Sequence, residues 1–261
     1  MPSASRFIQD LQGRGRYLFS TEEAAERLGR SLVATRAALR RLKAKGDIAD
    51  PQRGYHVIVP PEYRALGCLP ADQFVPDLMQ RLGEPYYVAL LSAAAYHGAA
   101  HQKPQVFQVM VPRRRRPIRC GEVRVAFISR SDMAKTPVIE RNTSRGTLRI
   151  AAAAATALEL VGYPEHCGGL SNVATVLAEL AESIDAEAVV AEAHRAPLAW
   201  VQRLGYLLAL VEASDLASAL DPVLVARKPF PVALAPSEPT AGSTSDARWK
   251  VAVNVHVEPD Q

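Results

Sequence analysis

The chain has 261 residues, long enough for two domains of ordinary size, and its 48% hydrophobic and 22% charged residues are typical of a globular protein. Three cysteines stand far apart without a CxxC pair, so neither a disulfide framework nor a zinc knuckle is indicated and we expect reduced thiols. No apolar run reaches the roughly 18 residues of a membrane span, and no signal-peptide core occurs, which predicts a cytoplasmic protein without a membrane partner.

The positive charge is concentrated at the N-terminal end. Residues 1–60 hold 11 Lys and Arg against 6 Asp and Glu, a net charge of +5. The other residues hold 20 against 21, a net of −1, so the whole excess of +4 comes from the first 60 residues. A local excess of this sign is what neutralisation of nucleic-acid phosphates requires.

The first 60 residues predict three helices followed by a pair of strands. A first helix is indicated by the spacing of Phe7, Ile8 and Leu11, and a capping box of Ser20 and Glu23 opens a second over 21–28. Gly29 supplies a turn, and a basic helix then spans 31–45. Two short strands, 47–50 and 54–59, surround Pro51-Gln52-Arg53 as a wing. This is the order of elements of a winged helix-turn-helix, which binds DNA.

The basic helix is the candidate recognition helix. Leu32, Thr35, Leu39 and Leu42 share one face at helical spacing, so we expect them to be buried and the small and basic residues to point outward. The alternative is a solvated helix face, which does not explain the wing. The residues expected at double-stranded DNA are Arg30, Ser31, Arg36, Arg40, Arg41, Lys43, Lys45, Arg53 and Tyr55.

A Pro60-Pro61 pair predicts a domain boundary, so that residues 61–261 form a larger C-terminal domain. A buried helix is expected over 86–100, followed by paired strands at 106–111 and 123–128. The arginine-rich stretch Arg113, Arg114, Arg115, Arg116 and Arg119 lies between the two strands. It is a solvated hairpin loop, an auxiliary DNA-backbone contact or a patch for an acidic protein partner, and the sequence does not choose among them.

The rest of the chain is rich in helices. Apolar stripes predict four of them between 151 and 220, two opened by Ser171 and Asp185. The Pro-, Ser- and Gly-rich residues 235–247 predict a mobile loop, and 249–258 a strand that joins the sheet of the C-terminal domain. Together with the N-terminal part, this predicts an α+β protein: a winged helix-turn-helix followed by a larger mixed α/β domain.

No catalytic site, metal site or cofactor site assembles in the sequence. His97 and His101 have the i, i+4 spacing of zinc ligands, but the residues between them include no Glu and no third ligand is indicated, so we expect histidines that pack or form hydrogen bonds. Neither a phosphate-binding GxxxxGK[ST] loop nor a GxSxG elbow occurs. We therefore expect no enzyme, and an enzyme acting on nucleotides is the less favoured alternative.

The serial order of several motifs resembles the AbiEi-like antitoxins of type IV toxin-antitoxin systems, also described as abortive-infection transcriptional regulators. Beyond the winged helix, the resemblance rests on YYVALLSAAAYHGAAHQKPQVFQVMV (86–111), VRVAFI, TSRGTLRIA (143–151), TALELVGYPEHCGGLSNVATVLAEL (156–180), VQRLGYLLALVE (201–212) and WKVAVNVHVE (249–258). Each motif is weak alone, but together they span nearly the whole chain.

The resemblance implies a bifunctional antitoxin active in phage defence. Its winged helix would bind inverted repeats in its own promoter and repress the operon. Its C-terminal antitoxin domain would counteract a nucleotidyltransferase-like toxin, without a stable complex being assumed. The alternative on the residues alone is a winged-helix regulator whose C-terminal domain senses a ligand or oligomerises.

Overall fold

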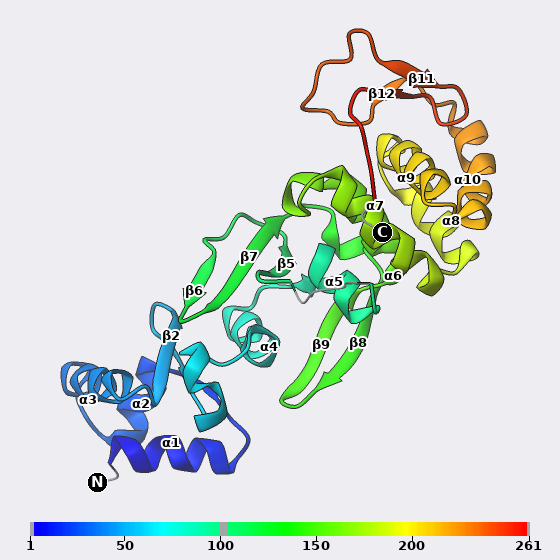
Figure 1. Ribbon diagram of the computed structural model, residues 1–261. Helices are drawn as coiled ribbons and strands as arrows, with labels where there is room; N and C mark the ends of the chain where they lie inside the picture. The colour runs from blue at the N-terminus through cyan, green and yellow to red at the C-terminus, as the bar shows by residue number, and fades with distance from the viewer. Residues whose placement is uncertain (1–2, 100–103, 260–261) are drawn as a thin grey trace. The chain divides into compact units, whose positions relative to one another are not determined.

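The computed structural model describes residues 3–99 and 104–259. Helices and strands are mixed along the chain, which confirms the predicted α+β class (Figure 1). Contacts divide the chain into two compact units. Unit 1 comprises Met1–Tyr87, Gln105–Ala134 and Glu140–Arg149, and unit 2 comprises Val88–Pro104, Lys135–Ile139 and Ile150–Gln261. No helix of the described ranges is long and apolar enough to cross a membrane.

Unit 1 begins with the three predicted helices and the predicted pair of strands, and an additional strand, β1, lies between the first two helices. They are α1 (Ala4–Gly13), β1 (Leu18–Ser20), α2 (Thr21–Leu28), α3 (Leu32–Ala44), β2 (Ile48–Gln52) and β3 (Tyr55–Ile58). The strands form an antiparallel sheet of order β1-β3-β2. The predicted caps are present, because the Ser3 and Ser20 hydroxyls accept from the backbone N–H of Arg6 and Glu23 at 3.2 and 3.1 Å. Gly29 takes a left-handed conformation, φ 59°, in the turn after α2.

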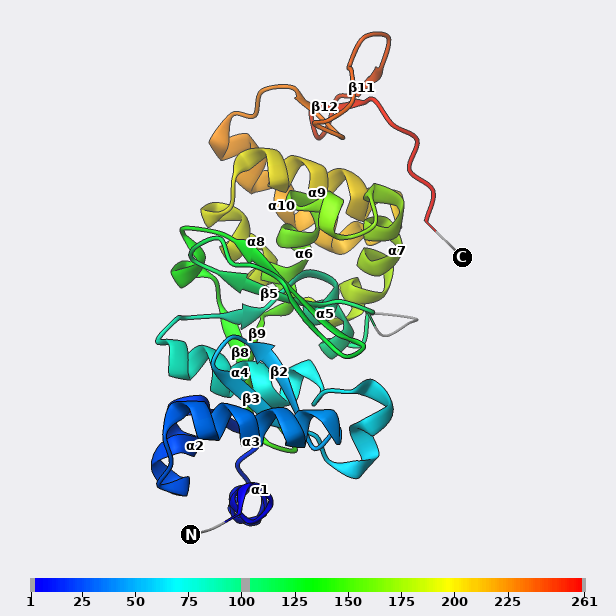
Figure 2. The same cartoon turned by 90° about the vertical axis from the view of Figure 1, so that its left-hand side faces the viewer.

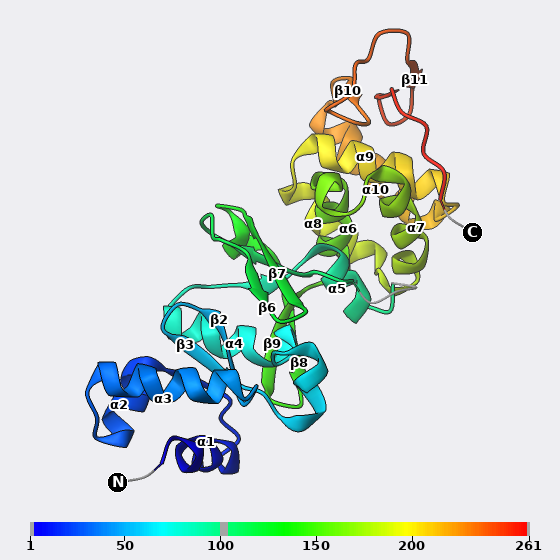
Figure 3. The same ribbon diagram turned by 60° about the vertical axis from the view of Figure 1, so that its left-hand side comes forward.

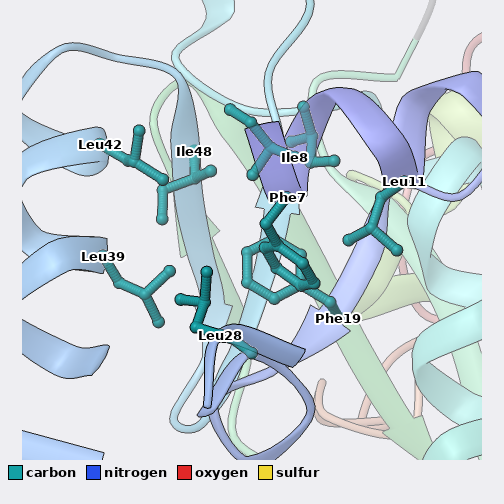
Figure 4. Packing of buried hydrophobic residues seen from close by; sticks show 10 residues of the cluster. Phe7, Ile8, Leu11, Phe19, Leu28, Leu39, Leu42 and Ile48 are labelled. Carbon is teal, nitrogen blue, oxygen red and sulfur yellow. The ribbon is translucent and has the colours of Figure 1, made fainter. Parts of the chain in front are cut away.

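A hydrophobic core joins α1, α2, α3 and the small sheet. Figure 4 shows the side chains of Phe7 and Phe19 together in this core, with Leu28, Leu39 and Leu42 contributed by α2 and α3. The Phe7 and Phe19 rings meet edge to face at 5.2 Å. One predicted member is wrong. Leu32, in the first turn of α3, is 41% exposed, whereas Thr35, Leu39 and Leu42 are buried as predicted and Ala38 is buried beside them.

The remainder of unit 1 adds a short 3-10 helix, α4 and most of the large sheet. The elements that follow β3 in the chain are η1 (Pro61–Leu66), α4 (Ala71–Leu82), β4 (Tyr87–Val88), α5 (Leu90–Tyr96), β5 (Phe107–Val111), β6 (Ile118–Cys120), β7 (Val123–Ser129), η2 (Met133–Lys135), β8 (Val138–Thr143) and β9 (Gly146–Ala151), of which α5 belongs to unit 2. The strand order of the sheet is β6-β7-β5-β4-β9-β8. The N-terminal 60 residues therefore pack with later strands in one compact unit, and their independence as a domain stays a prediction.

Two sequence predictions about this region were wrong. The helix expected over 86–100 starts with strand β4 and reaches only Leu90–Tyr96, while Ala100 lies outside the described residues. The predicted strands at 106–111 and 123–128 do pair, but in parallel, with Phe107 opposite Val125. A hairpin joins antiparallel strands, so the arginine-rich stretch is a crossover that carries the extra strand β6, and the hairpin-loop interpretation fails.

Unit 2 is built mainly from helices, gathered in Figure 2. They are α5, α6 (Ala153–Gly162), η3 (Pro164–His166), α7 (Leu170–Leu180), η4 (Ala181–Ser183), α8 (Ala186–Arg195), α9 (Leu198–Leu210) and α10 (Ser214–Arg227). Asp185 caps α8 as predicted, accepting from the Ala188 N–H at 2.9 Å. The predicted Ser171 cap is wrong, since α7 begins one residue earlier after Gly169. Helix α10 is not among the four predicted helices.

A small sheet at the end of the chain packs on α9. Strands β10 (Val232–Ala233), β11 (Thr244–Asp246) and β12 (Val251–Val253) form it in the order β10-β12-β11. It is separate from the large sheet, which corrects the prediction that 249–258 joins the main sheet. The predicted loop over 235–247 includes β11, and its mobility stays a prediction.

Gly205 lets the Trp249 ring lie directly against α9. A Cβ atom at this position would stand 2.1 Å from Trp249 Cζ3, and the buried Gln202 side chain donates to the Trp249 carbonyl at 3.0 Å. The helix therefore has no room for a methyl group at its contact with the sheet.

We expect Gly205→Ala to lower the free energy of unfolding of unit 2 by about 1–3 kcal/mol, because an overpacked core must shift the indole ring. Both tryptophans of the chain, Trp200 and Trp249, belong to unit 2, so urea unfolding followed by tryptophan fluorescence measures it. Gly13→Ala is the matched control, since no atom lies within 4 Å of its added Cβ. Equal stability of the two variants would contradict the packing role of Gly205.

Candidate nucleic-acid interface

Helix α3 presents an exposed strip of small residues with basic residues along both margins. Ala34 and Ala44 are exposed, and Val33 is 75% exposed although it is apolar. Thr35 and Leu39 lie on the opposite, buried face. The exposed face of the helix therefore has short side chains along its middle and long cationic side chains at its edges. A partner surface could approach the helix closely along the middle of this face.

The first margin faces the β2–β3 hairpin. Arg36, Arg40 and Lys43, spaced three and four residues apart, line a hollow of about 450 Å³. Asp50 and His56 of the hairpin line its other side. This hollow is open and mainly surrounded by polar side chains, so it suits a charged or hydrated group better than an apolar ligand.

The second margin faces α1. Arg30, Arg41 and Lys45 line a hollow of about 490 Å³ together with Ser3 and Ser5 at the start of α1. Ser31, also expected at DNA, caps α3 through its hydroxyl, which accepts from the Ala34 N–H at 3.3 Å. Its hydroxyl proton is still available to a ligand.

A chain of hydrogen bonds ties α3 and α2 to the β2–β3 hairpin; Figure 3 labels these four elements. Lys43 Nζ donates to Asp50 Oδ2 at 2.7 Å, and Asp50 Oδ1 lies 2.6 Å from His56 Nδ1. The other ring nitrogen, Nε2, lies 2.9 Å from the Thr21 hydroxyl. The hydrogen bond from His56, followed by that from Lys43, lowers the pKa of the Asp50 carboxyl despite its partial burial. We call this chain the Lys43–Thr21 relay.

The sequence did not reveal the role of Asp50 and His56, because they meet only once the hairpin folds back on α3. An alternating strand pattern places them on one hairpin but gives no sign that Asp50 contacts both His56 and Lys43. Arg53 and Tyr55, which were expected at DNA, flank the hairpin turn, where Gly54 has a positive φ of 82°. Arg53 is exposed and Tyr55 is half-buried.

The arginine-rich stretch divides into one inward and several outward side chains. Arg115 is only 14% exposed: it pairs with Glu84 at 2.7 Å, donates to Gln52 Oε1 of β2 at 2.7 Å and lies over the Phe127 ring. Its guanidinium is thus occupied within unit 1. Arg113, Arg114, Arg116 and Arg119 are exposed.

A second basic feature lies on strands β6 and β7. Arg119 and Arg124 are direct partners in the antiparallel pair, and both are exposed. Like charges opposite each other destabilise a sheet unless an anion or solvent screens them. Strand β6 packs beside β2, so this exposed pair belongs to the same compact unit as the hairpin.

The histidine considered as a zinc ligand has another role in the structure. His97 Nε2 lies 2.8 Å from the Ala151 carbonyl oxygen, which confirms the expectation of a hydrogen-bonding histidine. His101 lies outside the described residues. Among residues 3–99 and 104–259, no group of three His, Cys, Asp or Glu side chains is placed to hold a metal ion.

Comparison with known families assigns much of the chain after residue 86. The family model of the AbiEi antitoxin C-terminal domain matches residues 87–210. This segment is an AbiEi antitoxin C-terminal domain. The resemblance seen in the sequence is thereby confirmed, and the AbiEi domain supports an antitoxin of the type IV systems, which implies a toxin partner. The match excludes residues 1–86, so the winged helix-turn-helix and its DNA contacts stay predictions.

One solved structure resembles the chain over nearly its full length. It is the crystal structure of the RV2827C protein from Mycobacterium tuberculosis, with a TM-score of 0.66, 17% sequence identity and coverage of 95% of this chain and 90% of that one. At this identity the likeness shows the fold alone. Among curated proteins, none matches the chain.

We expect Asp50→Asn to weaken unit 1 most at neutral pH. A carboxyl whose pKa is lowered by folding stabilises the fold above its unfolded pKa of about 4, and loses that contribution as the pH falls through the lower folded value. Wild type and variant should therefore differ in free energy of unfolding near pH 7 and converge towards pH 3. Urea unfolding followed by circular dichroism measures this. The exposed Asp10→Asn is the control, and a difference that stays constant with pH would refute the assignment.

Proposed function

We propose that the protein is a DNA-binding antitoxin of a type IV toxin-antitoxin system. In this proposal residues 1–60 act as a winged helix-turn-helix that binds inverted repeats in the protein's own promoter and represses the operon. The AbiEi domain counteracts a nucleotidyltransferase-like toxin, and the mechanism does not require a stable toxin complex.

The observation that carries DNA binding is the surface of α3. The major groove of DNA, about 12 Å wide, admits a helix whose outward residues are small, and phosphates then lie along both edges of that helix. Arg36 and Arg40 line the hollow on one margin and Arg41 and Lys45 the hollow on the other, and in this proposal they contact those two phosphate rows. The position of Arg30 near the helix start suits a base edge or a backbone phosphate.

The hairpin extends this surface. Strands β2 and β3 serve as the wing in the proposal, with the exposed Arg53 at its turn. The neighbouring β6–β7 pair adds Arg119 and Arg124, whose mutual repulsion a phosphate would relieve. We therefore favour the DNA backbone over an acidic protein as the ligand of Arg119 and Arg124 on the β6–β7 pair.

We expect the double substitution Arg40→Ala and Arg41→Ala to weaken binding to the promoter duplex, because it removes one cation from each margin of α3. The slope of log affinity against log salt should become shallower by up to about 2, since each neutralised phosphate contributes about 0.9. Gel-shift titrations at several salt concentrations measure both quantities.

The matched control is Arg14→Ala with Arg27→Ala, which removes the same charge from exposed positions outside α3. An equal loss of affinity in the two double variants would mean that the effect comes from net charge and not from the position of the arginines on α3. Unchanged affinity of the α3 variant, with an unchanged circular dichroism spectrum, would overturn the recognition-helix assignment.

The two proposed activities should separate in the full-length chain. We expect the Arg40→Ala, Arg41→Ala variant to lose repression of a promoter fusion and still rescue growth of cells that express the cognate toxin, because neither residue belongs to the AbiEi domain. A rescue assay alongside a reporter assay, at matched protein levels, tests this. Loss of both activities in a stably folded variant would contradict the division of labour.

A further inference from the structure

Two of the three cysteines meet inside unit 1. Cys68 follows η1 and is fully buried, and Cys120 ends β6 and is 5% exposed. They are 52 positions apart in the sequence, and both are free thiols, as is the buried Cys167 of unit 2. Nothing in the sequence indicated this contact, because neither cysteine belongs to a motif.

The backbones that carry the two thiols touch. The Glu122 N–H donates to the Leu66 carbonyl at 2.8 Å, directly beside both cysteines. A Cβ atom on Gly121 would stand 2.1 Å from the Leu66 oxygen and 2.8 Å from the carbonyl carbon of Gly67. Gly121 also has a positive φ of 57°, so glycine is needed at this crossing of the two segments. The crossing fixes the two cysteines as neighbours.

The two thiols are joined by a hydrogen bond. This bond lowers the pKa of Cys120 against the effects of its burial and of the Asp50 carboxylate, with smaller contributions from Lys43 and the Asp50 backbone. The same bond, together with burial, raises the pKa of Cys68. Cys120 is also the more accessible of the two thiols, so we assign the first attack on an oxidant to it.

We propose that Cys68 and Cys120 are a reversible redox pair that forms a disulfide with a peroxide and thereby alters the β2–β3 hairpin. The Cys120 thiolate attacks one peroxide oxygen, the O–O bond breaks, and the sulfur becomes a sulfenic acid while hydroxide leaves. The Cys68 sulfur then attacks the Cys120 sulfur, the S–O bond breaks, and the second hydroxide leaves. The protons of the two thiols convert both hydroxides to water, so two thiols and one hydrogen peroxide give one disulfide and two waters.

The hairpin is affected because Cys120 touches it. The Cys120 sulfur interacts with the backbone of Asp50, the residue at the centre of the Lys43–Thr21 relay. A disulfide requires the two sulfurs to close to about 2 Å, which draws Cys120 towards Cys68 and away from its contact with the Asp50 backbone. Asp50 then loses one of its supports, and the hairpin loses part of its attachment to β6.

The disulfide is tested on the folded full-length protein treated with hydrogen peroxide, alkylated and digested with trypsin without reduction. Cleavage after Arg81 and Arg119 separates the two cysteines, so a linked peptide pair whose mass is lower by two hydrogen atoms identifies the bond. We expect this pair in the wild type and in Cys167→Ala, its disappearance with dithiothreitol, and its absence in Cys68→Ala and Cys120→Ala. Alkylated free Cys68 and Cys120 after peroxide treatment of the folded wild type, or bonds only to Cys167, would overturn the proposal.

The effect on the hairpin rests on the proposed DNA-binding function and is measured separately with the promoter duplex. We expect oxidation to weaken binding by about two- to tenfold, the range that loss of one hydrogen bond produces, and dithiothreitol to restore it. The Cys68→Ala variant should bind the duplex with the affinity of the reduced wild type, and peroxide should not change that affinity. Failure of the reduced wild type to bind would contradict the DNA-binding function, whereas a confirmed disulfide without any change in affinity would contradict only its coupling to the hairpin.

Discussion

Arginine side chains from the later part of unit 1 hold its N-terminal helices in place. The Arg145 guanidinium, at the turn between β8 and β9, stacks 3.3 Å above the centre of the Tyr17 ring and donates to Gln73 at 2.6 Å. Arg81 of α4 reaches Glu23 and the Leu18 carbonyl, both at 3.3 Å, and Arg115 joins Glu84 to the hairpin. A planar guanidinium can stack and donate at once, which lysine cannot do. Counting basic residues along the chain therefore overestimates the charge that remains for phosphates.

Local features of the fold were predictable because they depend on neighbours in the sequence. A serine hydroxyl can cap a helix by accepting from the backbone N–H three residues later, and this depends only on nearby residues, as at Ser3 and Ser20. Glycine adopts a left-handed backbone conformation with the least strain, as Gly29 does after α2. The buried face of α3 was only partly predictable. Leu32 fits the apolar period but is exposed in the first turn of the helix, and Ala38, which the apolar period did not mark, is buried.

The features that the sequence could not reveal all depend on segments far apart in the chain. An apolar strand pattern is the same for parallel and antiparallel pairs, so the sequence did not indicate the parallel pairing of β5 with β7. It also did not indicate that Arg115 points inward to Glu84. The same holds for the relay through Asp50 and His56 and for the meeting of Cys68 with Cys120. The AbiEi domain was identified by its resemblance to a known family, because the composition and apolar pattern of its residues predict only a packed domain.

The boundaries of the AbiEi domain and of the compact units differ, and the difference bears on how the protein works. The family match covers 87–210, yet strands β5, β6 and β7 and the β8–β9 turn within that range belong to the same compact unit as α1, α2 and α3. Residues that the family assigns to the antitoxin domain thus support the surface proposed to bind DNA. Contacts such as Arg115 with Gln52 and Arg145 with Tyr17 give a physical route by which a change in those strands alters the hairpin and α3. Part of the segment that the AbiEi model matches therefore belongs to the unit that carries the proposed DNA-binding surface, and the rest of it belongs to unit 2.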